Sequence, residues 1–64
     1  MTSFEKFEEL RKARELSSYQ VSKETGIASS TFSDWKSGRS KPGVEKLAKI
    51  ANFFGVTIEY FVTG

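Results

Sequence analysis

The chain has 64 residues, with ten Lys and Arg against eight Asp and Glu, so its formal net charge at pH 7 is +2. It contains no cysteine and no histidine, which excludes disulfides, thiolate and imidazole catalysis, and the transition-metal sites that use these ligands. A chain of this length forms at most one domain, so we expect residues 1–64 to be a single unit whose function lies on its surface.

The longest apolar runs are two or three residues, which is too short for a membrane span. The N-terminal MTSFEKFEEL has neither the cationic start nor the apolar middle of a signal peptide. We therefore expect a cytoplasmic protein. The surface pair Glu8-Glu9 is the best candidate for carboxylate catalysis, and no positioned nucleophile or base accompanies it. We expect no enzymatic activity, cofactor, metal or small-molecule substrate.

The first helix is predicted over about 3–14. Thr2 and Glu5 form a capping box at its start, and Phe4, Phe7 and Leu10 then recur on one face. Arg11 projects into the same apolar arc. Its guanidinium therefore needs a partner.

A second, short helix is predicted after a second capping box, formed by Ser17 and Gln20, with Val21 facing inward. Gly26 ends it in the left-handed conformation that glycine favours.

A third short helix is predicted from Ala28, with Ala28, Phe32 and Trp35 as its buried stripe, and Gly38 ends it.

The fourth helix is predicted between Pro42 and Gly55. The apolar residues that keep helical spacing there are Val44, Leu47, Ala48, Ile50, Ala51 and Phe54. Thr57 is expected to cap a final helical turn that carries Ile58, Phe61 and Val62. This segment has strand propensity, but no second strand is predicted to pair with it. The predicted fold class is all-α.

Two short helices joined by a tight glycine turn are typical of the helix-turn-helix motif. From LSSYQVSKETGIASSTFSDWKSGRSKP to GVEKLAKIANFFGVTIEYF, the chain resembles the lambda-repressor-like, Cro-type (Xre) helix-turn-helix family. The resemblance implies a compact five-helix bundle with the motif at about 17–37. The positions that match the buried and turn positions of the family are Val21, Gly26, Ile27, Phe32 and Trp35.

The chain departs from the family pattern at Ser22, Thr25 and Ala28, where the family favours alanine, an aliphatic residue and a hydroxyl N-cap. We expect each such loss of a cap or core contact to destabilise the chain by about 1 kcal/mol. The family also pairs its buried arginine with a glutamate at the position of Lys36. The candidate partners of Arg11 here are instead the ring of Trp35 and the carboxylates of Asp34 and Glu45.

The resemblance implies a DNA-binding transcriptional regulator, expected to be a repressor that associates with the nucleoid when bound and places its third helix in the major groove. The residues expected to read bases are Ser29, Ser30, Ser33, Asp34 and Ser37. The residues expected to contact phosphates are Ser17, Ser18, Tyr19, Gln20, Lys23, Lys36, Arg39, Ser40 and Lys41. Each group has an alternative interpretation without DNA contact. The serines could form an ordinary polar helix face, and the cations after the third helix could be ordinary solvated charges. Asp34 could be the partner in a local ion pair.

Reading of half-sites implies a homodimer on a palindromic operator in double-stranded DNA. The candidate dimer or partner face consists of Phe53, Tyr60, Phe61 and Val62. Phe53 points away from the inward arc of the fourth helix, and Phe61 and Val62 crowd a chain end that offers little to bury them. The rival hypothesis is a helical protein-interaction module that uses this aromatic face and binds no DNA.

Overall fold

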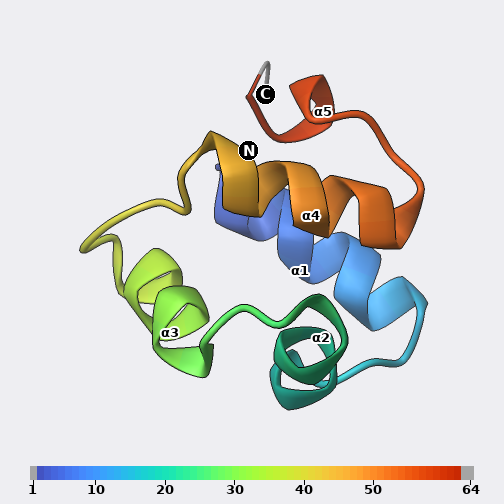
Figure 1. Cartoon of the computed structure of the whole chain (residues 1–64), viewed down its shortest axis with the longest axis horizontal. Coiled ribbons are helices and arrows are strands. Elements are labelled where there is room, and N and C mark those ends of the chain that lie inside the picture. Colours follow the sequence, from blue (N-terminus) through green and yellow to red (C-terminus); the bar gives the residue numbers. More distant parts are fainter. Residues whose placement is uncertain (1, 63–64) are drawn as a thin grey trace.

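The computed structural model describes residues 2–62, which form five α-helices and no strand within that range. The helices are α1 (Ser3–Ala13), α2 (Ser18–Thr25), α3 (Ser29–Ser37), α4 (Val44–Phe54) and α5 (Glu59–Val62). In Figure 1, α1 and α4 cross the middle of the molecule, with α2 and α3 on one side of them and α5 on the other. The predicted all-α fold is confirmed. Across residues 2–62, every helix is too short or too polar to cross a lipid bilayer.

Both predicted capping boxes are present. The Thr2 hydroxyl accepts a hydrogen bond from the Glu5 N–H at 3.1 Å, and the Glu5 carboxylate accepts one from the Thr2 N–H at 2.8 Å. Ser17 and Gln20 make the same reciprocal pair at 3.1 and 2.8 Å. These bonds use backbone donors that have no partner within the helix, so they fix where α1 and α2 begin. At the start of α3, Ala28 makes no side-chain cap.

The helices α1 to α4 are each followed by a residue in the left-handed conformation. Gly26 ends α2 with φ of 74°, and nothing lies within 4 Å of the position that its Cβ would occupy. The requirement for glycine there is therefore conformational, not steric. After α1 the same role falls to Glu15, which adopts φ of 55° although it has a side chain.

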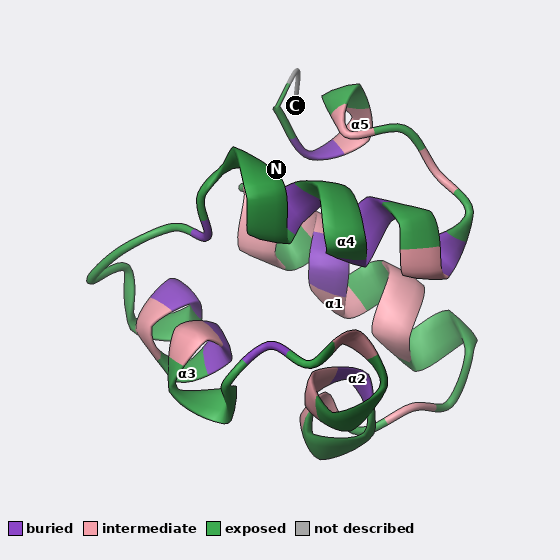
Figure 2. Ribbon diagram, viewed as in Figure 1, coloured by how far each residue is buried: buried purple, intermediate pink, exposed green. Residues whose placement is uncertain are grey.

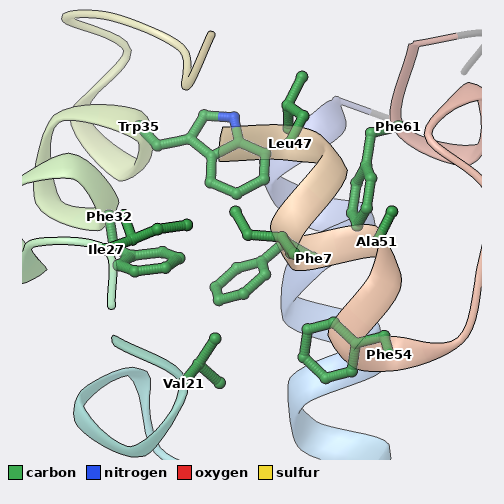
Figure 3. Close-up of a cluster of buried hydrophobic side chains, with 10 residues drawn as sticks. Phe7, Val21, Ile27, Phe32, Trp35, Leu47, Ala51, Phe54 and Phe61 are labelled. Atoms are coloured by element: carbon green, nitrogen blue, oxygen red, sulfur yellow. The ribbon is translucent and has the colours of Figure 1, made fainter. Parts of the chain in front are cut away.

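Phe7 lies at the centre of the hydrophobic core and is 0% exposed. Its ring centroid is 5.2 Å from that of Phe32, 5.1 Å from that of Trp35 and 6.0 Å from that of Phe54. Figure 3 shows this ring between the side chains of α3 and those of α4. The other residues of this core are Val21, Ile27, Leu47, Ile50, Ala51 and Phe61.

Three positions predicted to face the core are exposed. Figure 2 shows in green that α2, α3 and α4 each carry exposed segments as well as buried ones. Ala28 precedes α3 with an extended backbone (φ −58°, ψ 140°), so the helical periodicity does not reach it. Val44, which is 73% exposed, and Ala48 lie outside the buried stripe of α4. The apolar residues of α4 span a wider arc of the helix than the face that packs against the rest of the molecule.

The prediction that Phe61 is left at an open surface is wrong. Phe61 is 3% exposed because α5 packs against α1 and α4, and its ring centroid lies 6.1 Å from that of Trp35. Phe53 and Tyr60 are half-buried and pack against the core. Val62, at 66% exposed, is the open member of the predicted face.

Candidate nucleic-acid interface

The connection between α2 and α3 is held by apolar anchors and by hydroxyl groups. Val21 and Ile27 are buried at 0% and 4% exposed. The Ser22 hydroxyl donates to the carbonyl of Ile27, and the Thr25 hydroxyl donates to the carbonyl of Val21 at 2.7 Å. The side chains that depart from the family pattern thus find acceptors within the turn. We therefore expect the departures at Ser22 and Thr25 to destabilise the chain less than uncompensated polar groups would.

The start of α2 presents backbone donors on the side of the molecule shared with α3. Ser18 and Tyr19 are its first helical residues, so their N–H groups precede the first acceptor within the helix. The Tyr19 side chain is 70% exposed. Gln20 uses its side-chain oxygen for the capping box with Ser17, which leaves its amide nitrogen as a donor. A helix start with these groups favours an anion.

Four serines lie on the open face of α3. Ser29, Ser30, Ser33 and Ser37 are all exposed. Phe32 and Trp35, each 4% exposed, occupy the opposite face. The structure therefore brings the serines predicted to read bases onto one accessible surface.

Asp34 is tied to the loop that follows α3. Its carboxylate lies 3.9 Å from the Arg39 guanidinium, and its backbone carbonyl accepts a hydrogen bond from the Arg39 N–H at 2.9 Å. The Ser37 hydroxyl donates to the same carbonyl at 3.1 Å. This geometry is that of a local ion pair at the helix end, which was the alternative interpretation of Asp34.

Lys36, near the end of α3, and Lys41, in the loop after it, line a recess between the start of α1 and the segment after α3. This recess has a volume of about 630 Å³, and its polar side chains include Lys36, Ser40 and Lys41. Trp35 lines it as well, and the indole N–H donates to the Ser3 hydroxyl at 3.0 Å. Lys36 and Lys41 therefore lie beside the exposed face of α3, whereas Lys23 is exposed on α2.

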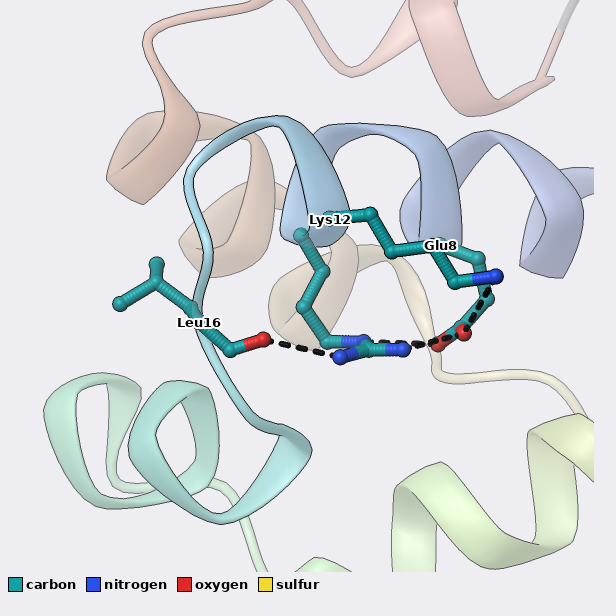
Figure 4. Close-up of polar contacts among 4 residues, drawn as sticks. Glu8, Lys12 and Leu16 are labelled. Carbon is teal, nitrogen blue, oxygen red and sulfur yellow. Dashed lines mark hydrogen bonds and ion pairs between the residues drawn. The ribbon is translucent and has the colours of Figure 1, made fainter.

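None of the three candidate partners of Arg11 is the observed one, because its carboxylate partner is Glu8. The Arg11 Nε donates to one Glu8 oxygen at 2.9 Å, and Nη2 donates to the other at 2.5 Å. Nη1 donates to the carbonyl of Leu16 at 2.8 Å, and the Leu16 N–H returns a bond of 3.0 Å to the Arg11 carbonyl. Figure 4 shows these contacts between Glu8, at the middle of α1, and Leu16, in the connection to α2.

The ion pair changes the titration of both groups. Hydrogen bonding from Arg11, followed by its charge and those of Lys12 and Lys36, holds the pKa of the Glu8 carboxyl below its ordinary value of 4.5. Glu8 in turn raises the pKa of the Arg11 guanidinium. The sequence signal for this pair was a glutamate three residues before an arginine on one helix, a spacing that places the two side chains side by side.

A second recess, of about 250 Å³, lies between α1 and the pair of helices α2 and α3. Its lining includes Ser18, Ser29, Ser33 and Lys36, together with Glu8 and Arg11. Sequence reasoning did not place Glu8 in the site. The structure puts its carboxylate beside residues predicted to contact DNA.

The fold and this surface define a small all-α domain built around two short helices joined at a glycine turn, with hydroxyls and cations on the open side of the second helix. Residues 4–64 match the family described as helix-turn-helix domain, and the chain belongs to that family.

The curated relatives are transcriptional regulators. The HTH-type transcriptional activator BcrR of Enterococcus faecalis is 33% identical over 60 residues, which cover 94% of this chain and 29% of that protein. The HTH-type transcriptional regulator YobD of Bacillus subtilis is 29% identical over 58 residues, or 91% of this chain and 52% of that protein. A regulator from Haemophilus influenzae is 38% identical over 45 residues, or 70% of this chain and 19% of its own length. The chain thus spans from about a fifth to about half of the relatives it matches.

Proposed function

We propose that residues 1–64 act as one sequence-specific DNA-binding unit of a transcriptional regulator, with α3 in the major groove of double-stranded DNA. The observation that carries this proposal is the open face of α3. Its serines are exposed, and Ser29 and Ser33 line one recess together with Ser18, from the start of α2. Arg39 and Lys41 follow α3 in the chain. A major groove admits a single helix, and the flanking hydroxyl, N–H and cationic groups are of the kinds that contact phosphates.

Within this proposal, Ser29, Ser30 and Ser33 read base edges. A serine hydroxyl donates or accepts, so it distinguishes base pairs less sharply than arginine, asparagine or glutamine does. We expect modest direct readout at each half-site. DNA shape supplies part of the discrimination. Ser37 and Asp34 contribute mainly by holding the loop that carries Arg39.

The phosphate contacts come from two groups of residues on either side of α3. At the start of α2 the donors belong to Ser17, Ser18, Tyr19 and Gln20, with Lys23 one turn further on. After the reading face, the donors belong to Lys36, Arg39, Ser40 and Lys41. These contacts are independent of sequence and release counterions, so they make affinity depend on salt.

We further propose that the chain binds a palindromic operator as a homodimer, because one helix touches too few bases for specific recognition. The dimer face is the surface around Val62, Tyr60 and Phe53. The first two belong to α5, which lies on the side of the molecule away from α2 and α3 (Figure 1). Phe61 supports this face from the core instead of contacting the partner.

We propose that the bound domain represses transcription by blocking RNA polymerase. We also propose that it acts in the cytoplasm, on the DNA of the nucleoid. One relative carries the word activator in its name, so the position of the operator relative to the promoter decides the sign. A promoter-reporter assay with the operator placed inside or upstream of the promoter distinguishes the two effects.

The experiment that tests the proposal is fluorescence anisotropy of the chain with a pool of random duplex DNA at two salt concentrations. Selection and sequencing of the bound fraction follow. We expect binding that weakens steeply with salt and enrichment of a palindrome. No binding at low salt would contradict the proposal and favour a protein partner at the aromatic C-terminal face.

A further inference from the structure

The recess of about 250 Å³ on the side of α2 and α3 has the donors of an anion site. Arg11 and Lys36 contribute the cations, and Ser18, Ser29 and Ser33 contribute hydroxyls. Guanidinium, ammonium and hydroxyl groups in one recess are the donors that phosphate oxygens prefer. A recess lined only by these donors would attract a phosphate group.

Among the residues of the described range 2–62 that line this recess, Glu8 is the one acidic residue. Its side chain is 22% exposed, and both of its oxygens accept hydrogen bonds from Arg11. Lys12 lies 4.0 Å from the same carboxylate but is itself 71% exposed. The Glu8 carboxylate is therefore the anion that occupies this recess.

The pairing with Glu8 also determines which N–H donors of Arg11 remain for a ligand. Its Nε and Nη2 donate to Glu8, and Nη1 donates to the Leu16 carbonyl. The two-pronged edge of a guanidinium that would bind a phosphate is the edge that Glu8 already uses. Glu8 additionally places a negative charge where a DNA backbone would approach.

We infer that Glu8 limits the affinity of the chain for DNA, because its carboxylate fills the anion position of this recess and holds Arg11 away from a backbone phosphate. The inference rests on the proposed function, since it assigns a role to a residue within the same interface. It gives Glu8 opposite effects on two quantities. The carboxylate stabilises the fold through Arg11 and weakens DNA binding.

The test compares Glu8→Gln with Glu9→Gln, which removes the same charge from an exposed neighbour outside the recess. Folding is checked by circular dichroism, and anisotropy with random duplex DNA gives affinity at several salt concentrations. We expect Glu8→Gln to bind about threefold more tightly near 0.1 M salt. The slope of log affinity against log salt should steepen by about one. Glu9→Gln should stay close to wild type. Equal or weaker binding by Glu8→Gln would overturn the inference.

The double variant Glu8→Gln/Arg11→Met tests whether the gain acts through Arg11. It has the net charge of the wild type and leaves no unpaired guanidinium, so we expect its DNA affinity to return to the wild-type value or below. A gain that persisted without Arg11 would overturn the inference. If Glu8→Gln fails to fold, Glu8→Asp replaces it. The shorter side chain withdraws the carboxylate from Arg11, so we again expect the affinity for DNA to rise.

A titration with inorganic phosphate separates this inference from the proposed function. In Glu8→Gln, the NMR signal of the Arg11 Nε–H should shift saturably with phosphate, whereas it should not in Glu9→Gln. Phosphate binding by Glu8→Gln in a chain whose wild type binds no DNA would support the recess and contradict the proposed function. DNA binding by the wild type with no phosphate shift in Glu8→Gln would contradict the inference alone.

Discussion

Glu15 occupies a backbone conformation that suits glycine. Its φ of 55° lies in the left-handed region, which costs a residue with a side chain about 1–2 kcal/mol. The conformation is required, because the Glu15 N–H donates to the Lys12 carbonyl and the Leu16 N–H donates to the Arg11 carbonyl, each at 3.0 Å. Together these bonds close the end of α1.

We therefore expect Glu15→Gly to raise the free energy of unfolding by about 0.5–1 kcal/mol, net of the greater freedom of glycine in the unfolded chain. Urea denaturation measures the change. Glu15→Ala retains the conformational cost and serves as the control, with no comparable gain expected. A glycine variant less stable than the alanine variant would be inconsistent with this account.

Ser30 and Lys41 are assigned different kinds of DNA contact, and their alanine variants should differ accordingly. Ser30→Ala should change which bases are preferred and leave non-specific affinity nearly unchanged, because a hydroxyl is lost from the reading face. Lys41→Ala should weaken all sequences alike and reduce the salt slope by about one. Selection from a random pool and anisotropy against salt measure both. The same profile for the two variants would contradict the division of roles.

At the scale of a helix, much of this fold follows from local sequence. The two capping boxes and the glycines at 26, 38 and 55 set the bounds of the helices through contacts within a few residues, so the sequence predicts them well. The sequence leaves the partner of Arg11 open among Trp35, Asp34 and Glu45, and its actual partner, Glu8 on its own helix, is not among these candidates. A search of neighbouring turns for carboxylates would have found it.

The Glu8–Arg11 pair connects α1 to the start of α2, and it makes stability depend on pH. The Glu8 carboxyl has a folded-state pKa below 4.5, while in the unfolded chain it titrates near that ordinary value. Its contribution is therefore complete above about 4.5 and is lost as the pH falls through the lowered pKa. Glu5 acts in the same direction through its bonds with Thr2.

Thermal melts between pH 7 and pH 3 should show a constant midpoint at the upper end and a decline below about pH 4.5. Glu8→Gln should start lower and decline less, since one of the two carboxyls with a lowered pKa is gone. A wild-type midpoint that rose on acidification would contradict the sign of this effect.

For the whole molecule, the core is a small set of aromatic rings gathered around Phe7. We expect Phe7→Ala to cost about 3–5 kcal/mol, which is comparable to the entire stability of many domains of this size. The variant should be largely unfolded by circular dichroism at 37 °C. Val62→Ala, at a position 66% exposed, should change the free energy of unfolding by less than about 0.5 kcal/mol. A cooperatively folded Phe7→Ala would show that the core does not depend on this ring.

Which apolar residues enter that core was the hardest feature to predict. Periodicity marks one face of a helix but not how much of it neighbours cover, so Val44 was expected inside and is exposed. Conversely, the burial of Phe61 depends on α5 folding back over α4 and over α1, and α1 is distant from it in sequence. The serines of α3 were predicted by family resemblance. Their exposure is what the structure adds.

The central claim is that the surface of α2 and α3 binds duplex DNA, and NMR of the isotope-labelled chain titrated with a short operator duplex tests it most directly. We predict that the largest amide shifts will fall at the start of α2 (18–20) and from the start of α3 through the following loop (29–41). Shifts confined to α5 and the end of α4, or no shifts at low salt, would contradict the claim and leave the C-terminal face as the functional surface.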